Sequence, residues 1–218
     1  MKKIKILIAD DHKITRQGLR SLLENEPDME VAAEAEEGRG AVKLAGELKP
    51  DIVIMDVSMP DLNGIEAARQ IVHKQPSIKV VALSMHSDNM FVTEMLKSGV
   101  SGYLLKDCAF EELASAIRSV IDGKTYLSPS ISGVIVNGYL NRISNPETDN
   151  SEILSDRERE ILQIIAEGKT TKQIALKLHI SIKTVETHRR KIMNKLNIFN
   201  VAELTKYAMR KGLTSLEK

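Results

Sequence analysis

The amino-acid sequence predicts two folds in succession: an α/β domain with a five-stranded parallel sheet, and then an all-α domain of four helices. Over the first 125 residues, five short apolar runs alternate with amphipathic helical stretches, which is typical of a parallel sheet with helices on both faces. The third run, 52–55, is apolar throughout, as expected for a strand covered on both sides. From residue 153 onward no strand pattern appears.

The elements of the α/β domain are expected in strict alternation. Gly64, Gly99 and Gly123 stand where helices should begin or end, because glycine interrupts helical periodicity. The expected strands are 4–9, 29–34, 51–55, 78–83 and 101–104, and the expected helices are 13–25, 39–48, 65–74, 88–98 and 109–122. In such a sheet the carboxyl ends of the strands lie at one edge, and ligands bind there.

Short polar signatures mark the helix starts of the second domain. Ser155 with Glu158, and Thr170 with Gln173, have the spacing of capping boxes, in which each side chain bonds the other residue's backbone N–H. Ser181 precedes a third helix with apolar residues at helical spacing, and a fourth helix follows near the end of the chain. The second domain is therefore expected to be a compact helical unit.

A polar segment separates the two domains. Its end is rich in Ser, Asn and Pro, and it contains one weak helical stretch near 129–140. We therefore expect a first domain at 1–124, a linker at 125–151 and a helical domain at 152–218.

Composition narrows the class of protein. The net charge is +1, but residues 152–218 hold 14 Lys and Arg against 8 Asp and Glu, whereas residues 1–151 hold 17 against 22. The basic half is a candidate for binding nucleic acid, the alternative being chance scatter of charge over the surface. Cys108 is the single cysteine, and no apolar run reaches the roughly 18 residues that span a bilayer. We expect a cytoplasmic protein with no membrane partner.

Polar side chains follow four of the predicted strands. Asp10 and Asp11 follow the first strand, and Asp56, Ser84 and Lys106 follow the third, fourth and fifth. Carboxylates that converge at one sheet edge repel each other unless a hard cation neutralises them, and oxygen ligands of this kind suit Mg²⁺. The alternative for any one aspartate is a helix cap or a turn. The set as a whole predicts a magnesium site.

These residue types also suit phosphoryl transfer. Asp10 and Asp11 would hold the ion, and Asp56 would be both a ligand and the nucleophile that attacks a phosphoryl group. Lys106 would pair with the phosphoryl charge, and the Ser84 hydroxyl would donate to one of its oxygens.

Together these motifs resemble the receiver domain of two-component response regulators over roughly residues 3–123. The resemblance rests on Asp10-Asp11-His12, Pro50-Asp51-Ile52-Val53-Ile54-Met55-Asp56, Met59-Pro60-x-x-x-Gly64 and Gly102-Tyr103-Leu104-Leu105-Lys106. It implies a flavodoxin-like fold, phosphorylation of Asp56 by a sensor histidine kinase and a main-chain carbonyl ligand from Ser58. It also implies that Tyr103 turns inward on activation, the alternative being a surface tyrosine at a strand edge.

A basic helix is expected after Ser181. Its apolar positions Val185, Ile192 and Leu196 face inward, which leaves a basic, hydrogen-bonding face suited to the major groove, the alternative being a merely solvated face. The wider pattern resembles the LuxR-type helix-turn-helix over about 152–213, and with the receiver it resembles a NarL/FixJ-type regulator. It rests on Leu154-Ser155-x-Arg157-Glu158, Glu167-Gly168-Lys169-Thr170, Lys172-Gln173-Ile174-Ala175 and Ser181-x-Lys183-Thr184-Val185-Glu186-x-His188.

The resemblance implies which residues contact double-stranded promoter DNA. Glu186, Thr187 and Arg190 fall where base edges are read. The residues better placed for phosphates are Lys183, Thr184, His188, Lys191 and Lys195. The last helix, near 200–210, is expected to form a homodimer contact when the protein is phosphorylated or bound to DNA. RNA polymerase is a further candidate partner.

Three alternative functions are compared with this one. An aspartate-nucleophile phosphatase would typically carry an acidic residue two positions after the nucleophile, where this chain has Ser58. A dinucleotide-binding enzyme would need Gly-x-Gly-x-x-Gly after the first strand, and this motif is missing there. A DNA-binding dimer that works without phosphorylation is the third reading. We expect self-catalysed phosphoryl acceptance and slow autodephosphorylation, not enzymatic turnover.

Overall fold

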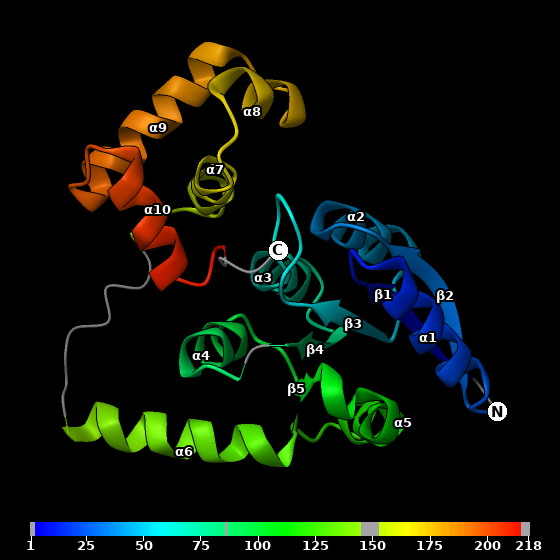
Figure 1. Ribbon diagram of the computed structural model, residues 1–218. Helices are drawn as coiled ribbons and strands as arrows, with labels where there is room; N and C mark the ends of the chain where they lie inside the picture. Colours follow the sequence, from blue (N-terminus) through cyan, green and yellow to red (C-terminus); the bar gives the residue numbers. More distant parts are fainter. Residues whose placement is uncertain (1–2, 86, 145–152, 215–218) are drawn as a thin grey trace. The chain divides into compact units, whose positions relative to one another are not determined.

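The computed structural model describes residues 3–85, 87–144 and 153–214 (Figure 1). The chain divides into two compact units, Met1–Asn145 and Pro146–Lys218. In the part of the chain that the structure describes, no helix is both long and apolar enough to cross a membrane.

The first unit is built on a parallel sheet whose strand order is β2-β1-β3-β4-β5-β6. The five predicted strands are confirmed with shifts of one residue at most, and β6 is an addition that the sequence patterns did not predict. The strands are β1 (Ile4–Ala9), β2 (Met29–Ala35), β3 (Ile52–Asp56), β4 (Lys79–Ser84), β5 (Gly102–Leu105) and β6 (Tyr126–Leu127). Because β1, β3, β4 and β5 are neighbours, the residues that follow them meet at one edge.

Helices cover both faces of this sheet (Figure 1). They are α1 (Lys13–Glu24), α2 (Gly38–Leu48), α3 (Gly64–Lys74), α4 (Asn89–Lys97) and α5 (Ala109–Ile121), with a short 3-10 turn η1 (Lys106–Cys108) before α5. Since strand side chains alternate between faces, Val53 and Met55 pack with α2, α3 and α4, whereas Ile52 and Ile54 pack with α1 and α5. Each fully buried aliphatic side chain contributes roughly 1.5–3 kcal/mol of burial free energy.

Gly64 lets the loop after β3 close tightly over the end of that strand. A Cβ atom at this position would lie 1.9 Å from the backbone oxygen of Asp56, so only glycine fits there. The adjacent Asn63 caps α3 by accepting a hydrogen bond from the Glu66 N–H at 2.9 Å. The loop that follows Asp56 is thus held by backbone packing and a helix cap.

The first half of the expected linker packs on the first unit. β6 pairs in parallel with β5, and the Ser128 N–H donates to the Tyr103 carbonyl at 3.0 Å. The helix that follows, α6 (Pro129–Ser144), places the fully buried Ile131 in the same hydrophobic cluster as Tyr103 and Phe91. A two-residue strand carries almost no sequence signal, because the exposed edge of β5 supplies the pairing.

The second unit contains four helices among its described residues, as predicted. They are α7 (Asp156–Ala166), α8 (Thr171–Lys177), α9 (Ile182–Leu196) and α10 (Val201–Arg210). Both predicted capping boxes are confirmed, and Ser181 caps α9 by accepting from the Thr184 N–H at 3.0 Å. The core is aliphatic, and Val185 and Ile192 on the inner face of α9 are buried in it.

Candidate functional site

A group of buried polar side chains lies at the carboxyl edge of the sheet in the first unit. Asp10 follows β1, Asp56 and Ser84 are the last residues of β3 and β4, and Lys106 follows β5. Asp10 and Asp56 are 1% and 3% exposed, and Ser84 is fully buried. Side chains that are up to 96 residues apart in the sequence therefore meet in one pocket.

The acidic part of this pocket has the composition of a cation site. One ligand atom each from Asp10, Asp11, His12 and Asp56 lies within 4.8 Å of all the others. Carboxylate oxygens at this spacing fit a hard divalent cation such as Mg²⁺, which prefers oxygen ligands. His12 was not among the predicted ligands; its Nδ1 lies 2.9 Å from an Asp11 oxygen.

Lys106 bridges the two buried carboxylates. Its Nζ lies 2.7 Å from Asp10 Oδ2 and 2.9 Å from Asp56 Oδ2. Burial alone would lower the pKa of Lys106, but the neighbouring charges of Asp56 and Asp10 outweigh burial and raise it. The ammonium therefore stays charged and offsets part of the carboxylate repulsion.

Asp56 carries a charge that its surroundings only partly stabilise. Burial raises the pKa of its carboxyl, Lys106 lowers it, and the like charge of Asp10 raises it further, with a net upward shift. The Ser58 N–H donates to Asp56 Oδ1 at 3.3 Å, which is a long hydrogen bond. The carbonyl of Ser58 as a metal ligand stays a prediction. An additional cation in the pocket would stabilise the ionised form of Asp56.

Tyr103 lies inside the protein, so the reading of a surface tyrosine is wrong. It is fully buried in the cluster that α4 and α6 share, and burial raises the pKa of its hydroxyl to about 12. A hydrogen bond with the Ser84 hydroxyl opposes that rise. Ser84 and Tyr103 therefore already form a contact between the pocket and the β5–α6 region.

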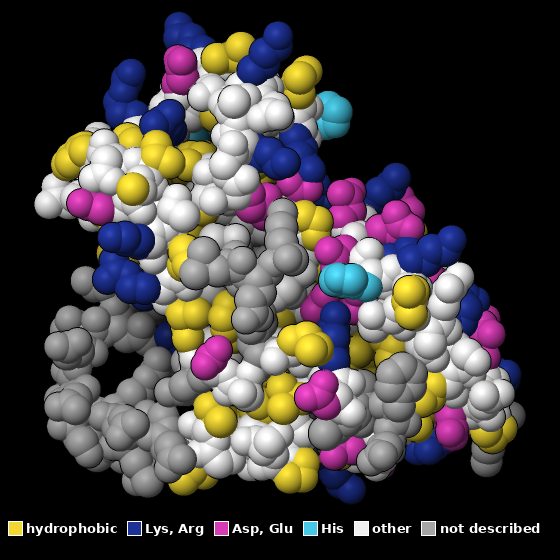
Figure 2. Space-filling model, viewed as in Figure 1, with side chains coloured by type: hydrophobic (Ala, Val, Ile, Leu, Met, Phe, Trp, Pro, Cys, Tyr) yellow, Lys and Arg dark blue, Asp and Glu magenta, His cyan; other side chains and the backbone are white. Residues whose placement is uncertain are grey.

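All the predicted DNA-binding residues lie on α9. Lys183, Glu186, Thr187, Arg190 and Lys191 are exposed, which leaves their side chains accessible to a ligand. The Thr184 hydroxyl contacts that of the capping Ser181 at 2.8 Å, and Thr184 is only half-exposed, as is His188. On the face shown in Figure 2, most charged side chains of the helical unit are Lys and Arg, with some Asp and Glu among them, whereas the first unit carries both signs of charge more evenly.

Lys195 differs from the other predicted DNA contacts. Its Nζ lies 2.6 Å from Oε2 of the buried Glu158, which also accepts hydrogen bonds from the Ser155 N–H and hydroxyl. This ammonium ties the end of α9 to the start of α7, which favours a positioning role over a phosphate contact. A carboxylate in a capping box, 37 residues earlier, gave no sequence signal for this pairing.

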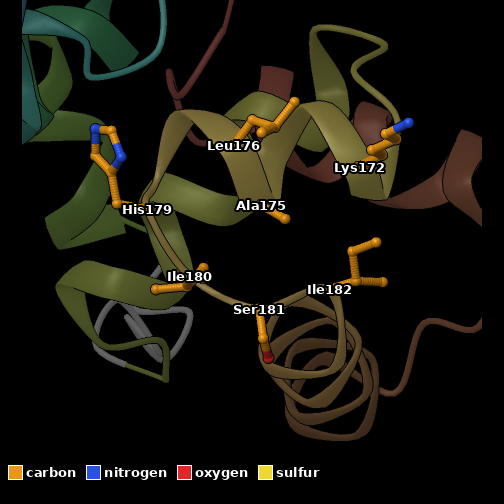
Figure 3. A pocket seen from close by; sticks show the side chains of 7 residues that line it. All are labelled: Lys172, Ala175, Leu176, His179, Ile180, Ser181 and Ile182. Carbon is orange, nitrogen blue, oxygen red and sulfur yellow. The ribbon is translucent and has the colours of Figure 1, made fainter.

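A groove runs between α8 and the start of α9 (Figure 3). It encloses about 420 Å³, and its lining includes Leu176, Ile180 and Ile182, with Lys172 and His179 on its margins. Leu176 and Ile182 are 69% and 47% exposed. Such an apolar lining offers few hydrogen bonds to phosphate, so the polar face of α9 remains the better candidate for DNA.

Comparison with known proteins agrees with both units. Residues 6–118 match the family model described as response regulator receiver domain, and residues 152–208 match that of the luxR family of bacterial regulatory proteins. The chain is 41% identical to the oxygen regulatory protein NreC of Staphylococcus carnosus over 214 residues, which cover 96% of this chain and 99% of NreC. It is 37% identical to the transcriptional regulatory protein DegU of Brevibacillus brevis over 209 residues, 90% of this chain and 89% of DegU.

Among solved structures, the chain is similar to RcsB in a structure of two RcsB dimers bound to two parallel DNAs. The TM-score is 0.59 at 28% identity, and the match covers 96% of this chain and 99% of RcsB. An interaction of this chain with RNA polymerase stays a prediction.

Proposed function

This chain belongs to the two-component response regulators that join a receiver domain to a LuxR-type DNA-binding domain, and on that premise we propose that Asp56 accepts a phosphoryl group from a sensor histidine kinase. The chain is a DNA-binding regulator of transcription, in a family whose members generally are not turnover enzymes. The phosphoryl group would control DNA binding in the cytoplasm.

One observation carries the proposal: Asp56 is buried beside two further carboxylates and is paired with Lys106. A carboxylate oxygen of Asp56 attacks the phosphorus of a phosphohistidine, the P–N bond breaks, and an acyl phosphate remains. Lys106 then pairs with the phosphoryl oxygens, and the Ser84 hydroxyl donates to one of them. Asp10, Asp11, Asp56 and the Ser58 carbonyl would hold Mg²⁺, which supplies charge neutralisation when it is bound.

The contacts of Tyr103 support a route out of the pocket. When Ser84 turns toward a phosphoryl oxygen, its hydrogen bond with Tyr103 changes. The main-chain carbonyl of Tyr103 accepts from the N–H of Ser128, the residue before α6, and Ile131 of α6 packs in the same buried cluster as the Tyr103 side chain. Phosphorylation would thus bias the docking of α6, which leads into the segment before the DNA-binding domain.

DNA binding is assigned to the exposed face of α9. Glu186, Thr187 and Arg190 would read base edges, and Lys183 and Lys191 would contact phosphates. Because RcsB binds DNA as dimers, we propose that this chain dimerises when phosphorylated or DNA-bound, with α10 in the contact, so that two recognition helices reach two half-sites.

The test compares wild type with Asp56→Asn, each with and without acetyl phosphate, on duplex DNA selected from a random pool. Intact mass measures phosphoryl uptake, and fluorescence anisotropy measures DNA affinity. We expect one phosphoryl group per wild-type chain, none on Asp56→Asn, and about a tenfold gain in DNA affinity for phosphorylated wild type alone.

The matched control is Asp122→Asn, because Asp122 is an exposed aspartate away from the pocket and should leave uptake unchanged. Equal DNA affinity in all four states would instead favour a dimer that works without phosphorylation. Turnover of acetyl phosphate far beyond one equivalent would favour an enzyme.

A further inference from the structure

Arg16 is a buried cation next to the acidic pocket, and the chemistry proposed above does not use it. It lies in the first turn of α1 and is 4% exposed. It shares the inner stripe of α1 with Leu19 and Leu23, where an apolar residue would be expected. A buried guanidinium is costly unless it is fully hydrogen-bonded, so its partners indicate its role.

The guanidinium of Arg16 joins three chain segments. Nη1 donates to the Asp10 carbonyl at 2.7 Å, Nε to Glu34 at 3.3 Å and Nη2 to Glu36 at 2.5 Å. Glu34 and Glu36 lie at the end of β2 and just after it, and the Asp10 carbonyl belongs to the turn that carries Asp10 and Asp11. A planar fork of donors can hold several acceptors at fixed angles, which an ammonium cannot do.

Hydrogen bonds from main-chain N–H groups also hold the turn at Asp10. The Asp10 N–H donates to the Ala35 carbonyl at 3.2 Å, and the His12 N–H donates to Asp10 Oδ1 at 2.8 Å. With Arg16 on the carbonyl, the peptide units on both sides of Asp10 are fixed. The directions of the Asp10 and Asp11 carboxylates depend on these units.

We propose that Arg16 is a positioning residue for the cation site: its hydrogen bond to the Asp10 carbonyl orients the carboxylates of Asp10 and Asp11 and thereby sets the affinity for Mg²⁺. The inference rests on the proposed function, because it assumes that this pocket takes up Mg²⁺. That ion tolerates little deviation from octahedral geometry, so loss of an outer support weakens binding by roughly tenfold or more.

The neighbouring Arg20 provides a matched control. It lies one turn along α1, donates to the same Glu34 at 2.5 Å and to Glu24 at 2.7 Å, and no described contact joins it to the Asp10 turn. The hydrogen bond from Arg20 is the main reason that the pKa of Glu34 is lowered. The two arginines thus share a carboxylate partner but differ in their contact with the pocket.

The experiment titrates Mg²⁺ alone into the full-length chain by isothermal calorimetry, for wild type, Arg16→Lys and Arg20→Lys. Lysine keeps the charge and removes the fork, so a change in affinity reports geometry and not net charge. We expect the Mg²⁺ dissociation constant to rise about tenfold in Arg16→Lys and to stay within about twofold in Arg20→Lys. Circular dichroism confirms folding and compares the two losses of thermal stability.

Should Arg16→Lys fail to fold, Glu36→Gln replaces it. Glu36 accepts from Nη2 of Arg16 and is 78% exposed, so this change should not disturb folding. The Mg²⁺ dissociation constant of Glu36→Gln should rise about threefold. Wild-type Mg²⁺ affinity in the folded position-16 or position-36 variant, or an equal loss in Arg20→Lys, overturns the role of Arg16 and leaves the proposed function intact. A wild-type chain that takes up no Mg²⁺ overturns both.

Discussion

Two buried carboxylates, one in each unit, each lie at hydrogen-bonding distance from a lysine, yet their pKa values shift in opposite directions. Asp56 lies 2.9 Å from Lys106, and Glu158 lies 2.6 Å from Lys195. Burial raises the pKa of both, yet the net shift is upward for Asp56 and downward for Glu158. The lysine partner therefore does not decide the outcome.

The difference comes first from depth, because Asp56 is much more deeply buried than Glu158, and then from the other neighbours. Glu158 also accepts from the Ser155 N–H at 2.8 Å and the Ser155 hydroxyl at 3.1 Å, so its charge is stabilised. Asp56 instead faces the like charge of Asp10, and the hydrogen bond from Ser58 is long. A satisfied carboxylate supports the fold, whereas an unsatisfied one has free energy to gain from a ligand.

The largest expected effect follows from removing the satisfied carboxylate. Glu158→Ala should lower the free energy of unfolding of the helical unit by about 2 kcal/mol, because it breaks the capping box and removes the partner of the exposed Lys195. Hydrogen exchange measured by mass spectrometry should rise in peptides from α7 and α9, with peptides from β3 as the internal control. Unchanged exchange in α7 would place the stability of this unit elsewhere.

A second prediction concerns pH in the absence of Mg²⁺. The pKa of Glu158 is lowered in the folded state, so its ionised carboxylate stabilises the fold above the unfolded pKa of about 4.3, and this contribution is lost as pH falls. The pKa of Asp56 is raised in the folded state, so its protonated form stabilises the fold below the unfolded pKa of about 3.9, and this contribution is lost as pH rises. At pH 7, Glu158→Gln should therefore be less stable than wild type, and Asp56→Asn more stable by about 1 kcal/mol. Both differences should shrink toward pH 3.

Thermal unfolding by circular dichroism between pH 3 and 8 measures both curves. Added Mg²⁺ should reduce the advantage of Asp56→Asn, because only wild type keeps the full set of ligands. Parallel pH curves for the two variants would contradict the distinction between a satisfied and an unsatisfied carboxylate.

The smallest effect tests whether Lys195 belongs to the fold or to the DNA contact. Lys195→Met should leave the salt dependence of DNA affinity unchanged, whereas Lys191→Met, at an exposed position one turn earlier, should reduce the slope of log affinity against log salt by about 0.9. Fluorescence anisotropy at several salt concentrations gives the slopes. An equal reduction in both variants would assign Lys195 to phosphate.

Sequence patterns predicted the alternation of strands and helices well, because periodicity and caps are local signals. They also brought Asp10, Asp56 and Lys106 to one edge, since the carboxyl ends of parallel strands must meet there. They did not find the pairing of Lys195 with Glu158, which depends on how α9 crosses α7. Arg16 had a signal that went unused: a charged residue in the apolar stripe of α1 requires a buried partner.

The short strand β6 and the buried Ile131 bear on how the receiver should be produced as a separate fragment. Truncation after residue 124 would remove β6, the pairing partner of β5, and would leave a cavity in the hydrophobic cluster of Tyr103, where Ile131 packs. Such a fragment would expose both a bare strand edge and apolar side chains, the two features that drive aggregation in solution. An expression boundary at residue 144, where α6 ends, keeps both covered.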